Sequence, residues 1–149
     1  FANFGPINVL EDTHSLAQWL AQYIKSGGRA CFGIMSPFCL WETLWHGAHL
    51  NWKIAGRRWR GKSSFIGSDG NVMPVYYPSI RQLTQSFAPY FRRTYLRPLG
   101  LFLPPSDVYG VIEKRPKLLK VLLSLEKRIG HIRQLSLFAD HYWIEFERV

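Results

Sequence analysis

The chain has 149 residues, 47% of them hydrophobic and 15% aromatic, which suffices for one domain with a single core and excludes a disordered segment. Nineteen Lys and Arg against ten Asp and Glu give a formal net charge of +9, which in a whole protein would favour a polyanionic partner. Two cysteines, Cys31 and Cys39, exclude a disulfide framework and indicate reduced thiols in a cytoplasmic protein. No apolar run reaches the roughly 18 residues of a membrane span, so no membrane partner is expected.

The first segments predict a helix that leads into a buried strand. Apolar side chains recur at helical spacing after Asp12 or Thr13, either of which can act as N-cap, and Gly27 and Gly28 then end the helix. The recurring residues are Leu16, Trp19, Leu20, Tyr23 and Ile24. RACFGIM (29–35) is a short apolar run between turn residues, which is typical of a strand buried on both faces of a parallel sheet.

A second helix is predicted directly after that strand, with Ser36 as N-cap and Pro37 in the first helical position. Its apolar stripe comprises Trp41, Leu44, Trp45, Ala48 and Trp52. The stretch 53–62 then holds five cations, no acid and two glycines, which predicts a mobile basic loop. The five are Lys53, Arg57, Arg58, Arg60 and Lys62.

The middle of the chain predicts a hairpin and a third helix. Two short strands flank a turn of Ser68, Asp69 and Gly70. Ser79 and Gln82 have the spacing of a capping box that opens the helix SIRQLTQSFAPYF.

The last third predicts two strands around a helix. RRTYLRPLGLFL contains Pro98, which places this strand near a sheet edge. PPSDVYG (104–110) is expected to be a loop and PKLLKVLLSLEKRI (116–129) a helix. DHYWIEFERV alternates as a closing strand with three apolar side chains on one face: Tyr142, Ile144 and Phe146.

This order resembles the C-terminal half of class I S-adenosylmethionine-dependent methyltransferases. ANFGPINVLED resembles the loop after the family's fourth strand, residues 24–28 resemble its L-K-P-G-G turn, and RACFGIM resembles its fifth strand. SIRQLTQSFAPYF, RRTYLRPLGLFL and DHYWIEFERV resemble the next helix, the sixth strand and the antiparallel seventh strand. The resemblance covers nearly the whole chain and implies an α/β fold, the C-terminal part of a Rossmann-like sheet. Its strands would lie in the order fifth, seventh, sixth, in one domain (1–149) with a substrate-side insertion at 36–78.

One departure from the family bears directly on activity. The glycine-rich loop after the first strand and the acidic residue after the second, which hold the cofactor, have no counterpart in these residues. We therefore expect a truncated fragment of a longer enzyme, in which Phe1 is the tail of the fourth strand. Alone it would bind S-adenosylmethionine weakly or not at all, and would be inactive. The uncovered edge of RACFGIM would favour self-association.

The resemblance also implies site residues. Asn3, Phe4 and Gly5 would pass beside the methionine part of the cofactor, and Asn8 would face the reaction centre. The alternative is that Gly5 and Pro6 form a turn and that the Asn8 side chain makes hydrogen bonds to the backbone amides of the loop.

Further candidates lie on the predicted second helix, over the mouth of the site. They would either line the substrate or belong to the core: Phe38, Trp41, Glu42 and Trp45. His46 is a weak candidate for a general base. His46 and His49 have the spacing of a metal pair, but the third ligand would have to be Asp140 or His141, and no metal site is expected.

The parent enzyme would methylate a small molecule. Two alternatives are a stand-alone basic module that binds nucleic acid through 53–62 and 114–133, and a partner-binding domain without a ligand. The second basic stretch has an opposite apolar face, as a solvated surface helix does, so a nucleic-acid partner is not expected.

Overall fold

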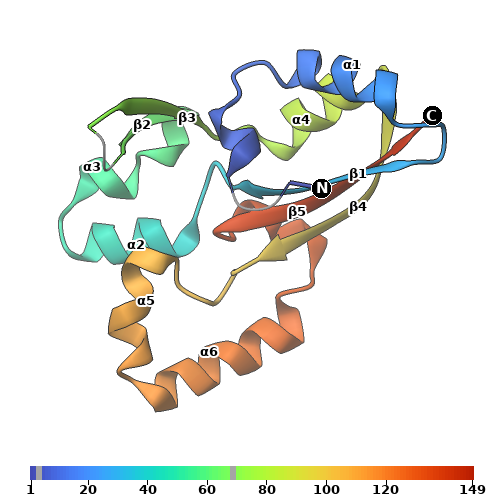
Figure 1. The fold of residues 1–149 in the computed structure, drawn as a ribbon. Helices are drawn as coiled ribbons and strands as arrows, with labels where there is room; N and C mark the ends of the chain where they lie inside the picture. The colour runs from blue at the N-terminus through green and yellow to red at the C-terminus, as the bar shows by residue number, and fades with distance from the viewer. Residues whose placement is uncertain (3–4, 68–69) are drawn as a thin grey trace.

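The computed structural model describes residues 1–2, 5–67 and 70–149, which form an α/β fold as predicted (Figure 1). The strands are β1 (Arg29–Met35), β2 (Lys62–Ile66), β3 (Val72–Tyr76), β4 (Phe91–Leu99) and β5 (His141–Arg148). The helices are α1 (Thr13–Tyr23), α2 (Leu40–Ala48), α3 (Trp52–Ala55), α4 (Ile80–Phe87), α5 (Ser106–Glu113) and α6 (Pro116–Ile129). Three 3-10 turns are η1 (Pro6–Val9), η2 (Arg58–Arg60) and η3 (Arg133–Leu137).

The main sheet has the strand order β1-β5-β4, with the last strand of the chain in the middle. β5 runs antiparallel to both neighbours, and Ile144 lies opposite Phe32 on one side and Leu96 on the other. β4 is an outer strand of the sheet, as Pro98 predicts. The prediction that 29–35 lies in a parallel sheet is not confirmed, because β1 pairs antiparallel with β5. Among the described residues its parallel pairing is one isolated bridge between Ala2 and Phe32. β2 and β3 form the predicted hairpin, whose turn residues Ser68 and Asp69 lie outside the described residues.

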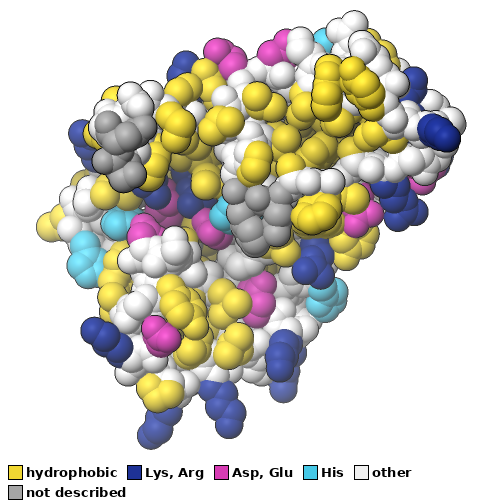
Figure 2. All heavy atoms as spheres, viewed as in Figure 1, with side chains coloured by type: hydrophobic (Ala, Val, Ile, Leu, Met, Phe, Trp, Pro, Cys, Tyr) yellow, Lys and Arg dark blue, Asp and Glu magenta, His cyan; other side chains and the backbone are white. Residues whose placement is uncertain are grey.

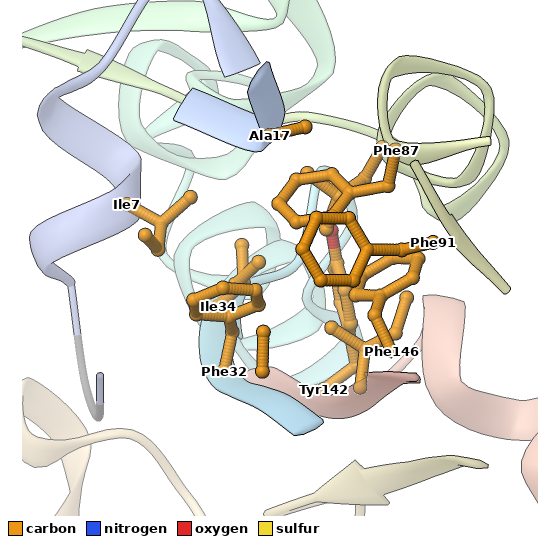
Figure 3. Packing of buried hydrophobic residues seen from close by; sticks show 11 residues of the cluster. Ile7, Ala17, Phe32, Ile34, Phe87, Phe91, Tyr142 and Phe146 are labelled. Carbon is orange, nitrogen blue, oxygen red and sulfur yellow. The ribbon is translucent and has the colours of Figure 1, made fainter. Parts of the chain in front are cut away.

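The core lies between this sheet and helices α1 and α4, which cover one face of it (Figure 1). Tyr142, Ile144 and Phe146 all point into this layer with no exposed surface, as the alternation in β5 predicts. Phe87 of α4 stacks on Phe146 with ring centroids 4.3 Å apart and meets Phe91 at 5.5 Å (Figure 3). These aromatic side chains fix α4 on the sheet.

Local signals define the starts of the two covering helices. The carboxylate of Asp12 accepts hydrogen bonds from the backbone N–H groups of His14 and Ser15, so Asp12, and not Thr13, is the N-cap of α1. Ser79 and Gln82 form the predicted capping box of α4.

The second predicted helix begins later than expected, at Leu40, with Cys39 as N-cap. Ser36 cannot cap it because its N–H donates to the carbonyl of Asp140 and its hydroxyl donates to the carbonyl of Ser136. The helix also ends early. Leu50 adopts a left-handed backbone (φ 58°), so the following residues form the separate helix α3.

Two segments that were predicted to be loops are ordered. Residues 104–110 contribute to α5, because Val108 and Ile112 lie one helical turn apart and are both buried. The expected mobile loop at 53–62 contains α3 and η2, and Arg58 within it is only 5% exposed. Among residues 1–2, 5–67 and 70–149, the helices lack the length and apolarity that a bilayer crossing requires.

Candidate functional site

A cleft of about 440 Å³ opens where β1 ends and β5 begins. Its walls come from η1, from the β2–β3 hairpin and from the start of α5. Six of the residues that line it are Asn8, Met35, Arg57, Ser63, Asp107 and His141. Figure 2 shows charged side chains of both signs in the hollow between the hairpin and the region of α5 and α6. Open α/β sheets bind their ligands at the carboxyl ends of strands, which is where this cleft lies.

Asn8 joins three elements at the inner wall of the cleft. It is 1% exposed, and its side-chain amide donates to the carbonyls of Tyr76 (2.7 Å) and Met35 (3.4 Å). Its Oδ1 accepts from the N–H of Met35 at 3.0 Å. The amide thus satisfies backbone groups at the ends of β1 and β3, as in the alternative interpretation. Gly5 also lines the cleft and has a left-handed backbone (φ 101°). Asn3 and Phe4 lie outside the described residues.

An ionic cluster of Glu42, Arg57, Arg58 and Asp140 forms the floor, and within it Glu42 and Arg58 are buried. Arg57 binds Glu42 through two hydrogen bonds, Nε to Oε1 at 2.9 Å and Nη2 to Oε2 at 2.7 Å. Arg58 donates from Nε to Glu42 Oε2 at 3.0 Å and from Nη2 to Asp140 Oδ1 at 2.7 Å. Four charges of balanced sign therefore hold α2, η2 and the start of β5 together.

The cluster shifts the ionisation of its members. Burial disfavours the charged form of Asp140, but the hydrogen bond from His141 and the charge of Arg58 outweigh it and lower the pKa of this carboxyl group. Burial likewise opposes the charge of Arg58, while Asp140 and Glu42 raise its pKa above the usual value. Arg58 and Asp140 therefore each favour the charged form of the other.

His141 stands at the wall of the cleft in a fixed orientation. Its Nδ1 lies 2.9 Å from Oδ2 of Asp140, and its side chain is 13% exposed. An imidazole that donates from Nδ1 to a carboxylate carries its basic lone pair on Nε2. This pairing is the common arrangement of a general base and the group that orients it. The sequence signal for it is the dipeptide Asp140-His141 at the start of an alternating strand, which was weighed only as a metal ligand.

The four predicted substrate residues do not converge on this cleft. Trp41 and Trp45 line a separate apolar hollow of about 380 Å³ between α2 and α6, and Trp41 Nε1 donates to the carbonyl of Phe102 at 2.8 Å. The ring of Phe38 stacks on Trp59 with centroids 5.7 Å apart. Glu42 is turned inward to the two arginines.

His46 lies near the rim of the cleft. Its Nε2 is 3.4 Å from Oδ2 of Asp107, which lines the cleft. Within residues 1–2, 5–67 and 70–149, no group of three or more His, Cys, Asp or Glu side chains is arranged to hold a metal ion.

The cluster also bears on the nucleic-acid alternative. Arg57, Arg58 and Arg60 flank Trp59 and would stack on or pair with a polyanion, but the guanidinium groups of Arg57 and Arg58 are bound to carboxylates instead. Lys53, Arg60 and Lys62 are the exposed cations of this stretch.

No family model matches the chain, and no curated protein matches its sequence. Among solved structures the fold is similar to an S-adenosylmethionine dependent methyltransferase from Mesorhizobium loti, with a TM-score of 0.51 and 11% sequence identity. The superposition covers 99% of this chain and 60% of that one, so the chain spans about three-fifths of its neighbour's length. At this identity the likeness shows a methyltransferase-like fold alone.

Proposed function

We propose that this chain forms the acceptor-binding part of an S-adenosylmethionine-dependent methyltransferase that acts on a small molecule. The observation that carries the proposal is the cleft at the end of β1, walled by Arg57, Asp140 and His141, in a chain whose fold superposes on a methyltransferase over 99% of its length. A concave site with a few convergent polar groups fits a small acceptor.

The sheet supports a finer assignment. β1, β5 and β4 would correspond to the fifth, seventh and sixth strands of the family's sheet, with β5 as its antiparallel strand. Ala2 forms a parallel bridge with β1, donating its N–H to the carbonyl of Cys31 and accepting from the N–H of Gly33. A fourth strand of the family would occupy this side of β1. On this proposal the glycine-rich cofactor loop belongs to a preceding segment, and the coding sequence upstream of Phe1 is expected to carry it.

The cofactor would enter the cleft beside η1. Gly5 and Val9 line the cleft there and would lie against the methionine end of the cofactor. Asn8 would act by holding η1 in place, because its amide is already bonded to the ends of β1 and β3. The bound cofactor supplies an electrophilic methyl group, and the protein supplies orientation and exclusion of water.

The acceptor would be a hydroxyl or amine that must lose a proton. His141, which lines the cleft, would take part in this proton transfer, and Asp140 would orient its imidazole through Nδ1. His46 near Asp107 is the second candidate for the base. The remaining candidates, Phe38, Trp41 and Trp45, would contact only an acceptor large enough to extend beyond the cleft. Glu42 would have an indirect role, because it holds Arg57 at the cleft wall.

Amide chemical shifts of the isotopically labelled 149-residue chain test this proposal. S-adenosylmethionine at millimolar concentration is expected to shift the signals of Gly5, Val9 and Met35, with a dissociation constant too weak for calorimetry. Micromolar binding would contradict the expectation that the cofactor is held mainly from outside the chain. If the signals of the cleft residues stay unchanged at the highest soluble concentration of S-adenosylmethionine, the proposed cofactor site loses its support.

The outer edge of β1 gives a further proposal, self-association. Ala2 covers this edge only around residues 31–33, and unpaired strand edges recruit other chains. Light scattering over a concentration series is expected to show a dimer or larger species, and a monomer throughout would contradict it.

A further inference from the structure

Helix α6 exposes a stripe of aliphatic side chains. Leu119, Leu122 and Ile129 face inward, and Leu122 joins a small core with Val108 and Ile112. On an outer flank of the helix, three residues at positions i, i+3 and i+7 are 37%, 55% and 36% exposed: Leu118, Val121 and Leu125. We call these three residues the α6 stripe. Helical spacing of this kind forms a continuous apolar band that the rest of the described chain leaves open to solvent.

Cations border the α6 stripe. Residues 114–133 contain seven Lys or Arg and a single acid, Glu126. The carboxylate of Glu126 is turned toward the protein, where it accepts from the N–H groups of Leu101 (3.4 Å) and Phe102 (2.7 Å). The outward surface of α6 therefore carries one sign of charge. Figure 2 shows Lys and Arg side chains projecting from the end of the molecule that Figure 1 assigns to α6.

We propose that α6 docks on a membrane surface that contains anionic lipids. The α6 stripe would enter the boundary between headgroups and acyl chains, and Lys117, Lys120 and Arg128 would lie at the level of the phosphates. A helix with an aliphatic band, basic flanks and no outward acid has the composition of an interfacial helix.

The chemistry of the stripe selects this partner over two others. Binding of single-stranded nucleic acid also uses aromatic side chains that stack on bases, whereas the exposed apolar residues of α6 are Leu and Val, and residues 116–129 contain no aromatic side chain. Phosphate contacts alone would leave the aliphatic band exposed. A second copy of the chain would bring two positively charged surfaces together. An anionic bilayer satisfies both the aliphatic band and the charge.

Sedimentation with vesicles tests the proposal on the 149-residue chain. Vesicles of phosphatidylcholine with 30% phosphatidylserine are expected to retain the protein at low salt, and vesicles of phosphatidylcholine alone are expected to retain at least tenfold less. Raising the salt to 0.5 M should weaken the binding because it screens the charges.

Two pairs of variants separate the contributions of charge and stripe. Lys117→Glu/Lys120→Glu and Leu118→Ser/Val121→Ser should each lower the partition coefficient about tenfold or more. Lys25→Glu/Arg60→Glu makes the same charge change at exposed positions away from α6, and Ile66→Ser/Val72→Ser removes apolar groups at the hairpin that are more exposed than those of the α6 stripe. These controls should bind like the original chain, and far-ultraviolet circular dichroism checks that all four keep the fold.

Three outcomes would overturn the proposal. One is equal retention by neutral and anionic vesicles, and the second is a loss in the control variants as large as in the α6 variants. The third is tight, salt-sensitive binding of a mixed RNA oligonucleotide that Lys117→Glu/Lys120→Glu abolishes, without retention by anionic vesicles, which would assign α6 to nucleic acid.

Discussion

Arg58 and Asp140 meet inside the protein although 82 residues separate them in the chain. Nη2 of Arg58 donates to the carboxylate of Asp140 at 2.7 Å, and Nη1 donates to its backbone carbonyl at 2.9 Å. Because the same guanidinium group binds Glu42, one side chain connects α2, η2 and the residue that precedes β5. The floor of the cleft depends on this connection.

Replacing Arg58 should be strongly destabilising. Arg58→Met leaves Glu42 and Asp140 with less of their compensating charge, and removing one partner of a buried ionic group costs about 3–5 kcal/mol in the free energy of unfolding. Urea denaturation monitored by tryptophan fluorescence measures this. Arg60→Met, an exposed position in the same turn, should change stability by less than about 0.5 kcal/mol. Equal effects of the two substitutions would show that the cluster does not stabilise the fold.

Acid should destabilise the protein through Asp140. Its pKa is lower in the folded chain than the ordinary value of 3.8, so the folded state binds this proton less readily than the unfolded state. The resulting stabilisation is complete above about pH 5 and is lost as the pH falls through the folded pKa. The free energy of unfolding should therefore drop below about pH 4, and by less in Asp140→Asn. Glu113→Gln, on an exposed carboxyl group of α5, should retain the full drop. An identical acid profile in Asp140→Asn would contradict this assignment.

Asn8 should behave as a buried structural amide. Asn8→Ala removes the hydrogen bonds that the Asn8 amide makes to the backbone of Met35 and Tyr76. The buried backbone groups then lose their partner, which should lower the free energy of unfolding by about 1–3 kcal/mol. Thermal or urea unfolding gives the difference. Asn51→Ala is the control, because Asn51 is exposed and its side chain does not cap α3. A neutral Asn8→Ala variant would reopen a direct role for this residue in ligand binding.

The two cysteines should differ in reactivity. Burial raises the pKa of the Cys39 thiol to about 11, and this residue is 2% exposed. Cys31 is half-buried on β1, and burial also raises its pKa. At pH 8 a disulfide reagent such as DTNB should modify Cys31 well before Cys39, and both at once in denaturant. Cys31→Ser should remove the faster phase and Cys39→Ser should keep it. Fast modification that survives in Cys31→Ser would mean that Cys39 is accessible.

Local patterns predicted the parts of the fold that depend on neighbours in sequence. The Asp12 cap, the Ser79–Gln82 box and the alternation of Tyr142, Ile144 and Phe146 each act within one or two turns or along one strand, and the structure contains all three. α5 was missed because two apolar residues one turn apart, Val108 and Ile112, gave too little periodicity beside prolines.

Long-range partners account for the rest. Ser36 has the properties of an N-cap, but hydrogen bonds to Ser136 and Asp140 use its polar groups. From the sequence alone Arg58 is expected to be an exposed cation of a loop. It is buried because Glu42 and Asp140, which are distant in sequence, bind its guanidinium group. The resemblance indicated site residues in the first loop and on the second helix, but the pairing of Asp140 with His141 and Arg58 required the three-dimensional arrangement.

The place of β5 in the middle of the sheet has a consequence for biosynthesis. Arg29 of β1 pairs with Glu147, more than a hundred residues later, and β4 also has its partner only in β5. Until β5 leaves the ribosome, both outer strands lack the strand between them, so the sheet is completed only after β5 has been synthesised. In that interval a chaperone would meet the apolar side chains of β1 without the strand that covers them.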